Sequence, residues 1–199
     1  MCAGSGKRWG FHKPKQLSLV EGVPNLIRTI EMIKRTGYED IWITVSEDKK
    51  HYFPPELNLL IGNNKYETQR YSNGFPLVGE TVYLYGDVIY NEPDLNSILF
   101  SRHNTTWFGR LGPNPITGKN HGELMGVHVI DTKRFEEAVS ETNRQFKEGE
   151  RKMCIGWDVL EIHEGVNRMK ATNFVSLSNY SDDFDDIKEY KHLLKVYDL

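Results

Sequence analysis

The chain has 199 residues, enough to bury one sizeable core, and its 38% hydrophobic and 27% charged residues are typical of a folded protein rather than a disordered chain. A formal net charge of −3 with scattered basic residues excludes the broad positive surface of a duplex-binding protein, so no nucleic-acid partner is expected. No apolar run approaches the roughly 18 residues of a membrane-spanning helix, and the N-terminus lacks the apolar core of a signal peptide, so we expect a cytoplasmic protein without a membrane partner.

The first half of the chain alternates between helical and strand patterns after an opening loop. Apolar residues recur at helical spacing over 25–37, and Gly37 is placed to end that helix. Short apolar or β-branched runs at 40–46, 57–62 and 81–90 predict strands, with a helical turn as the alternative for the second run. The segment 63–79 is polar and broken by Gly and Pro, which predicts a loop.

The second half continues the alternation. Helices are predicted over 94–102, 132–149 and 186–197, and strands over 123–131, 157–163 and 173–178. The segment 104–122 is rich in turn residues without a clear period, and we expect it to be a long excursion of the kind that is often functional.

Strands that alternate with helices predict an α/β fold. We expect one domain over residues 1–199, a three-layer α/β/α sandwich around a mainly parallel mixed sheet. Ligands of such sheets bind outside the carboxyl ends of the strands.

The opening stretch "AGSGKRWGFHKPKQL", residues 3–17, is the most informative motif of the chain. Gly4 and Gly6 allow a backbone loop whose N–H groups cradle an anion, with phosphate as the expected guest. The stretch is not a Walker phosphate loop, because that motif needs a glycine where Met1 stands and Ser or Thr where Arg8 stands. It also lacks the third glycine of a dinucleotide fingerprint.

The order A-G-x-G-x-R followed by K-P-K-Q-L resembles the signature loop of the GT-A-like nucleotidyltransferases, the family of the molybdenum-cofactor guanylyltransferases and of the cytidylyltransferases of isoprenoid and teichoic acid synthesis. The resemblance continues through 20–46, and more weakly at "YLYGDV" and "DDFDDIKEY". It implies the Rossmann-like fold of the nucleotide-diphospho-sugar transferases. In that fold a buried strand precedes the glycine loop, so the first strand is expected to be truncated here.

The resemblance implies an enzyme that moves a nucleoside monophosphate from a nucleoside triphosphate, with CTP favoured, to a phosphorylated sugar, alcohol or related acceptor and releases pyrophosphate. It places Lys15 on the α-phosphate and Arg8 at the triphosphate as the catalytic cations, and it implies a magnesium ion held by Asp87 and Asp185. Asp183 is the competing second ligand. The nucleotide-binding residues implied are Ala3, Gly4, Ser5, Gly6, Lys7, Arg8, Lys15 and, from the loop "ETQRYSNG", Ser72, with Arg70 as a further candidate contact.

Structural alternatives exist for the carboxylates. Asp87 is also suited to a turn at a strand end, and Asp185 or Asp186 to capping the last helix. Two other functions share parts of the pattern: a GT-A glycosyltransferase that consumes a nucleotide-sugar, and a nucleotide-binding module without chemistry. A homodimer is a further assembly to consider.

The remaining chemistry-bearing residues give weaker signals. His121, Glu123 and His128 lie close in sequence, as do His163 and Glu164, but their spacing is not that of a zinc motif. The two cysteines, Cys2 and Cys154, are too few for a disulfide framework and are expected to be small buried residues. Aromatic and basic residues of the excursion that could close over an acceptor, or simply pack, are Trp107, Phe108 and Arg110.

Overall fold

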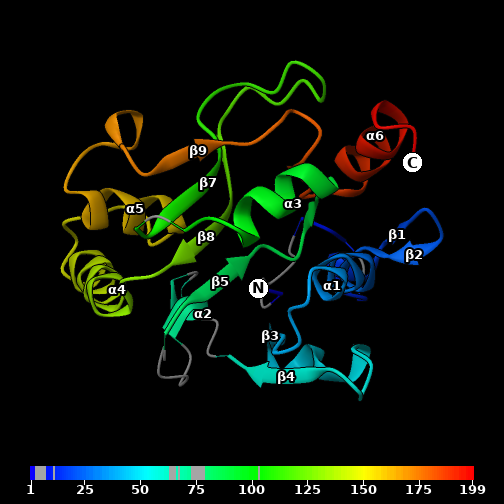
Figure 1. The fold of residues 1–199 in the computed structure, drawn as a ribbon, viewed down its shortest axis with the longest axis horizontal. Coiled ribbons are helices and arrows are strands. Elements are labelled where there is room, and N and C mark those ends of the chain that lie inside the picture. Colours follow the sequence, from blue (N-terminus) through cyan, green and yellow to red (C-terminus); the bar gives the residue numbers. More distant parts are fainter. Residues whose placement is uncertain (3–7, 11, 63–65, 67, 73–78, 103) are drawn as a thin grey trace.

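The largest sheet of the molecule has four strands. The computed structural model describes residues 1–2, 8–10, 12–62, 66, 68–72, 79–102 and 104–199, without the side chains of residues 69 and 72. The strands lie in the order β5 (Thr81–Leu84), β8 (Glu123–Val129), β7 (Thr106–Arg110) and β9 (Phe174–Ser176) (Figure 1). The β5/β8 and β7/β8 pairs are antiparallel, and the β7/β9 pair is parallel.

Three smaller strand pairs surround this sheet. β3 (Trp42–Val45) runs parallel to β4 (Asn58–Ile61), whereas β1 (Leu19–Val20) and β2 (Val23–Pro24) form an antiparallel hairpin. β6 (Val88–Ile89) pairs antiparallel with β10 (Asp182–Asp183). The predicted α/β fold with a mixed sheet is confirmed. The balance of strand directions differs from the expectation, because antiparallel pairs outnumber parallel ones among the described residues.

The chain start links two of these sheets. The Cys2 N–H donates to the Thr44 carbonyl at 2.9 Å, and the Gly86 N–H donates to the Met1 carbonyl at 3.0 Å. The Met1 amino group also donates to the Leu84 carbonyl. Two residues therefore connect β3 to the end of β5 by main-chain hydrogen bonds, although they form no assigned strand.

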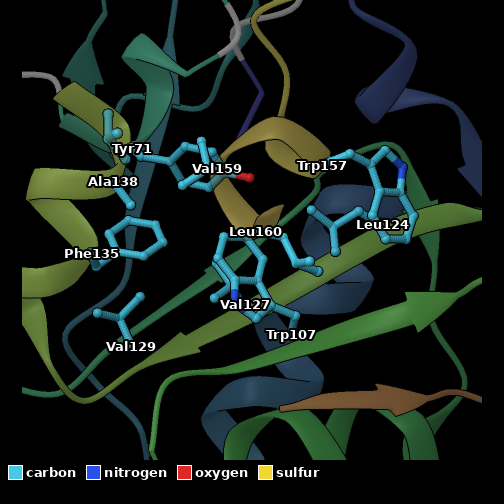
Figure 2. Packing of buried hydrophobic residues seen from close by; sticks show 11 residues of the cluster. Tyr71, Trp107, Leu124, Val127, Val129, Phe135, Ala138, Trp157, Val159 and Leu160 are labelled. Carbon is cyan, nitrogen blue, oxygen red and sulfur yellow. The ribbon is translucent and has the colours of Figure 1, made fainter. Parts of the chain in front are cut away.

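Helices cover both faces of the four-stranded sheet. α4 (Thr132–Lys147) and α5 (Gly156–Glu164) lie over one face, where Phe135 and Leu160 pack against Trp107 and Val127 of the strands (Figure 2). α1 (Asn25–Arg35) and α3 (Glu92–Leu99) cover the other face with a second buried cluster. Each fully buried large apolar side chain contributes about 1.5–3 kcal/mol, so the two clusters hold the three layers together.

One predicted strand is wrong. Residues 157–163 lie in helix α5, which begins where the Asp158 carboxylate accepts a hydrogen bond from the Ile155 N–H at 3.1 Å. It ends at Gly165, whose φ of 69° is readily adopted only by glycine. Trp157 and Leu160 are three positions apart and both buried, which is helical spacing within a run too apolar to show its period.

The predicted excursion 104–122 contains a strand that the sequence analysis missed. Every residue of β7 is buried, and its adjacent aromatic side chains alternate between faces. Trp107 packs under α4 and α5, whereas Phe108 packs with α1 and α3. Only 111–122 remains as the connection from β7 to β8, and it projects beyond the sheet in Figure 1.

The other predicted helices and strands are confirmed, with the run 81–90 divided into β5 and β6. The predicted loop 63–79 lies partly outside the described residues, and its described part contains a short helix over 69–72. The C-terminal helix is α6 (Ile187–Val196). The remaining short elements are η1 (Lys15–Leu17), η2 (Glu47–Tyr52), α2 (Gln69–Ser72) and η3 (Arg168–Lys170). Within the described ranges, no helix has both the length and the apolar character that crossing a bilayer requires.

Candidate active site

Lys15 is placed by a short turn directly after Pro14. Pro14 has φ −56°, close to the angle its ring fixes, and its carbonyl accepts from the Leu17 N–H at 3.0 Å. The resulting 3₁₀ turn η1 is buried throughout, and Leu17 anchors it in a cluster with residues of α1 and β3. This anchoring carries the lysine side chain inward, so that Lys15 is only 8% exposed.

Asp87 lies in the break between β5 and β6. The break is closely packed at Gly86, where an added Cβ would lie 2.3 Å from the Cys2 sulfur. Only glycine fits there without displacing the chain start. The Asp87 carbonyl then accepts from the Phe184 N–H at 3.3 Å, which fixes the break beside the strand β10 and the residues that follow it.

Asp185 follows β10, where burial alternates along the chain. Asp182 and Phe184 are fully buried, whereas the side chains of Asp183 and Asp185 are 14% and 24% exposed. This alternation is what an extended backbone produces when one of its faces is packed. Asp183 and Asp185 therefore share the face that Asp87 also reaches.

Lys15 joins the two carboxylates. Its Nζ lies 2.7 Å from the Asp87 Oδ2 and 3.0 Å from the Asp185 Oδ1, and it donates to the Phe184 carbonyl at 2.8 Å. Burial opposes the charged ammonium, but the charges of Asp87 and Asp185 outweigh it and raise the pKa of Lys15. Burial likewise opposes the Asp87 carboxylate, yet Lys15 lowers its pKa below the ordinary value. Lys15 and Asp87 are therefore both charged at neutral pH.

Arg8 reaches the same site from the solvent side. Its Nη2 lies 2.7 Å from the Asp185 Oδ2, and its side chain is 76% exposed. Asp185 thus holds one buried cation and one exposed cation. The two basic residues that the sequence analysis singled out converge on one carboxylate, at the mouth and at the base of the site.

A second lysine, whose side chain is 8% exposed, pairs with Asp183 of β10. The Lys119 Nζ, which comes from 111–122, pairs with the Asp183 carboxylate and donates to the Asp183 carbonyl at 2.9 Å. It also lies 3.9 Å from the Glu123 carboxylate. Burial, reinforced by the charge of Asp183, raises the pKa of Glu123 to about 8, while Lys119 acts in the opposite direction. Sequence reasoning missed Lys119, because nothing in a turn-rich stretch marks its partner.

Asp182 anchors 111–122 to the strand. Its fully buried carboxylate accepts from Arg110 at 3.2 Å, from the Asn114 amide at 3.0 Å and from the Thr117 hydroxyl at 2.7 Å. Donors surround both oxygens, so this carboxylate is a structural group. The arrangement fixes the start of β10 one residue before Asp183 and three residues before Asp185.

Asp183 and Asp185, the two candidates for the second metal ligand, differ in their surroundings. Asp185 is the carboxylate that meets Asp87 across Lys15, whereas Asp183 is paired with Lys119. The alternative role of capping the last helix belongs to Asp186, whose carboxylate accepts from the Lys188 N–H at 2.7 Å. Asp185 is therefore available to the site.

Asp87 and Asp185 also pass a test for a divalent ion. They offer hard carboxylate oxygens already held within contact of one cationic centre, and both side chains are partly exposed. Magnesium is usually held by one or two carboxylates together with substrate phosphates, so this donor set fits it. Among the described residues, no group of three or more His, Cys, Asp or Glu is arranged to hold a metal without such help.

Several of the predicted nucleotide-binding residues lie outside the part of the chain that the structure describes. The implied nucleotide contacts at Ala3, Gly4, Ser5, Gly6 and Lys7 lie outside the described residues. The backbone of Ser72 lies in α2, and its side chain is not described.

The other candidate residues have structural partners. His121 contacts Glu123 at 2.8 Å, while His128 is buried against Glu80 and His163 against Glu164. Each of these three histidines therefore contacts a different carboxylate. Trp107 and Phe108 are core residues of the sheet and do not form a cover over an acceptor.

The comparisons with known proteins agree on one fold. The sequence matches no protein-family model and no curated protein. The structure is similar to a Bacillus anthracis protein described as a glucose-1-phosphate thymidylyltransferase, with a TM-score of 0.70 and 14% identity over 100% of this chain and 94% of that chain.

Two further solved structures extend this likeness. The CTP:phosphocholine cytidylyltransferase of Streptococcus pneumoniae matches with a TM-score of 0.59 and 17% identity, over 98% of this chain and 96% of that chain. The UDP-glucose pyrophosphorylase of Acinetobacter baumannii matches with a TM-score of 0.60 and 11% identity, over 98% and 90%. The chain therefore has the nucleotidyltransferase fold that its opening loop resembles.

Proposed function

We propose that residues 1–199 form one nucleotidyltransferase domain, which transfers a nucleoside monophosphate from a nucleoside triphosphate to a phosphorylated acceptor and releases pyrophosphate. The observation that carries the proposal is the meeting of Lys15, Asp87 and Asp185 at contact distance, from three distant parts of the chain. Buried charges at such a junction are costly for a fold unless they are paired, and they gather most often at functional sites.

The reaction joins two anions, so positioning and charge neutralisation must supply most of the catalysis. An oxygen of the acceptor phosphate attacks the α-phosphorus, a new P–O bond forms, and the bond to the β-phosphate oxygen breaks to release pyrophosphate. We assign Lys15 to the α-phosphate, because its buried ammonium lies at the base of the site. We assign Arg8 to the outer phosphates, where a planar guanidinium on the solvent side binds two oxygens at once.

Asp87 and Asp185 would hold the magnesium ion, with triphosphate oxygens completing its ligands. Bound there, the ion would neutralise charge that develops on the phosphates. The chain's own contribution is to keep the two carboxylates facing each other, which the β6/β10 pairing and the Phe184 hydrogen bond to Asp87 achieve. We propose the same geometry as the reason that Asp185, rather than Asp183, is the second ligand.

CTP is the triphosphate we favour. The K-P-K-Q-L sequence and the stretch that contains Ser72 resemble the cytidylyltransferase branch, and one structural neighbour is described as a CTP-dependent enzyme. The acceptor is a phosphorylated small molecule, a sugar or an alcohol. Neighbours described as acting on either kind share this fold.

Pyrophosphate release tests the proposal. The protein would be incubated with magnesium, each of the four common ribonucleoside triphosphates and a panel of phosphorylated sugars and alcohols. We expect release that depends on magnesium and on an acceptor, and we expect the Lys15→Ala variant to lose it while its circular dichroism spectrum is unchanged. Turnover retained in Lys15→Ala would contradict the assignment, and tighter binding of a nucleotide-sugar than of any triphosphate would favour a glycosyltransferase instead.

A further inference from the structure

Every N–H group of the Lys15 ammonium has an acceptor in the structure. It has three N–H groups, and the structure gives it three acceptors: the Asp87 carboxylate, the Asp185 carboxylate and the Phe184 carbonyl. No donor remains for a phosphate oxygen. A lysine that acts on the α-phosphate must therefore give up at least one of these contacts.

The charges around Asp87 and Asp185 are balanced in this arrangement. Lys15 and Arg8 together supply two positive charges, which match the two carboxylates. An incoming divalent ion therefore meets oxygens that an ammonium already neutralises. To bind there, the ion must displace Lys15. This lysine is 8% exposed, and among the described residues it has no other carboxylate within salt-bridge distance.

A polyphosphate changes this balance. It brings its own negative oxygens, which can receive the displaced ammonium at the moment when the ion takes its place. A divalent ion without phosphate offers Lys15 no such acceptor and leaves a buried ammonium unpaired, which is costly.

We propose that Lys15 is a resident counter-ion of the Asp87–Asp185 pair, which it leaves only when a complex of divalent ion and polyphosphate enters. The proposal rests on the proposed function and specifies its substrate: the site takes the ion as a chelate with the triphosphate, not as the free ion. Lys15 thus has two alternative sets of partners, carboxylates before binding and phosphates after it. Because linkage is reciprocal, the triphosphate strengthens ion binding by the same factor by which the ion strengthens triphosphate binding.

Manganese binding without turnover tests this. Free Mn²⁺ can be followed by electron paramagnetic resonance while the protein is titrated, with and without a non-hydrolysable CTP analogue. Wild-type protein is expected to bind Mn²⁺ weakly alone and about tenfold or more tightly with the analogue, after correction for binding of Mn²⁺ by the analogue itself. Equal affinity in both conditions would overturn the claim that the ion enters as a chelate with the triphosphate.

The Lys15→Met variant supplies the second arm. Without analogue it is expected to bind Mn²⁺ about tenfold more tightly than wild type, since the two carboxylates then lose their buried cation and keep only the exposed Arg8 beside Asp185. Lys15→Gln is the substitute if the methionine variant does not fold, as judged by circular dichroism. The matched control is Lys191→Met, which makes the same change at an exposed position of α6 and should leave Mn²⁺ affinity unchanged.

The double variant Lys15→Met with Asp87→Asn shows whether the gain belongs to this pair, and it should lose the gain. A lysine variant that binds Mn²⁺ no better than wild type would refute the counter-ion role. These measurements distinguish the counter-ion role of Lys15 from the proposed nucleotide-binding function. Tighter Mn²⁺ binding by Lys15→Met, together with no binding of any triphosphate analogue by wild type, would support the counter-ion role and refute the nucleotide-binding function.

Discussion

Asp182 and Asp185 stand three residues apart on the same segment, and their surroundings are opposite. Asp182 is fully buried and surrounded by Arg110 at the end of β7 and by Asn114 and Thr117 of the connection between β7 and β8. Asp185 is 24% exposed and is shared by Lys15 from within and Arg8 from solvent.

The difference shows how one acidic run serves two purposes. A carboxylate whose oxygens accept from fixed donors is locked, and removing it leaves buried groups unpaired. A carboxylate held by cations that can exchange partners remains available to a ligand. The burial alternation of an extended backbone, and not residue type, separates the two.

The largest expected effect is on stability, at Asp182. Asp182→Ala leaves the Arg110 guanidinium buried without its counter-ion, so we expect the free energy of unfolding to fall by about 3–5 kcal/mol. Urea denaturation followed by circular dichroism measures it. Asp185→Ala is the matched comparison and should cost about 1 kcal/mol or less, since Arg8 turns to solvent and Lys15 keeps the Asp87 carboxylate and the Phe184 carbonyl. Equal losses in the two variants would remove the distinction drawn between them.

Asp185, whose replacement should cost less stability than that of Asp182, should matter strongly for activity, as the Asp185→Asn variant tests. The amide keeps the shape of the side chain but loses the charge that would hold the metal, so we expect magnesium-dependent pyrophosphate release to fall about a hundredfold or more. The melting temperature should change little. Asp183→Asn, two residues earlier on the same face, should have a much smaller effect on turnover because Lys119 already neutralises Asp183. A larger loss at Asp183 would exchange the two roles.

The pH dependence of stability should report on Glu123. Its pKa is raised from the ordinary 4.5 to about 8, first by burial and then by the charge of Asp183. Between these values the folded protein binds more protons here than the unfolded chain, so the free energy of unfolding falls as pH rises through this window.

Glu123→Gln cannot titrate and should flatten that fall, gaining about 1 kcal/mol relative to wild type near pH 8. Part of the slope should remain, because burial also raises the pKa of Asp183, to about 6. Urea denaturation at a series of pH values gives the slope. An identical slope in both proteins would show that Glu123 is ionised throughout.

Arg8→Gln should show the smallest change in stability. Its ion pair with Asp185 lies at an exposed position, so the free energy of unfolding should change by less than about 0.5 kcal/mol. Triphosphate affinity, measured by calorimetry, should still fall severalfold, because the guanidinium is assigned to the outer phosphates. Unchanged affinity would limit the site to Lys15 and the two aspartates.

Much of the fold could be predicted because its elements carry periodic patterns. α1 shows its apolar stripe, and β3 and β8 their runs of strand-forming residues. The elements α5 and β7 could not be predicted, each for a different reason. Trp157 and its neighbours are apolar on most sides, which hides the helical period. The five residues of β7 are buried on both faces, inside a stretch rich in turn residues.

The proximity of Lys15, Asp87 and Asp185 could be expected from the sequence to the extent that local motifs carry it, and their role as a site stays a prediction. Lys15 follows a recognisable loop, and Asp87 and Asp185 follow strand-like stretches that resemble those of a known family. Lys119 and Asp182 could not be predicted, because their roles arise from contacts between residues 64 to 72 positions apart. Such a contact depends on how 111–122 folds back over β10, and no local pattern encodes that.

The central claim is that Lys15, Asp87 and Asp185 form one site for a metal-bound triphosphate. Calorimetric titration of wild type and of Asp87→Asn with non-hydrolysable triphosphate analogues, with and without magnesium, tests it most directly. We predict binding of at least one analogue to wild type that requires magnesium and is weakened about tenfold or more in Asp87→Asn. Equal binding to both proteins, or binding that ignores magnesium, would contradict the account.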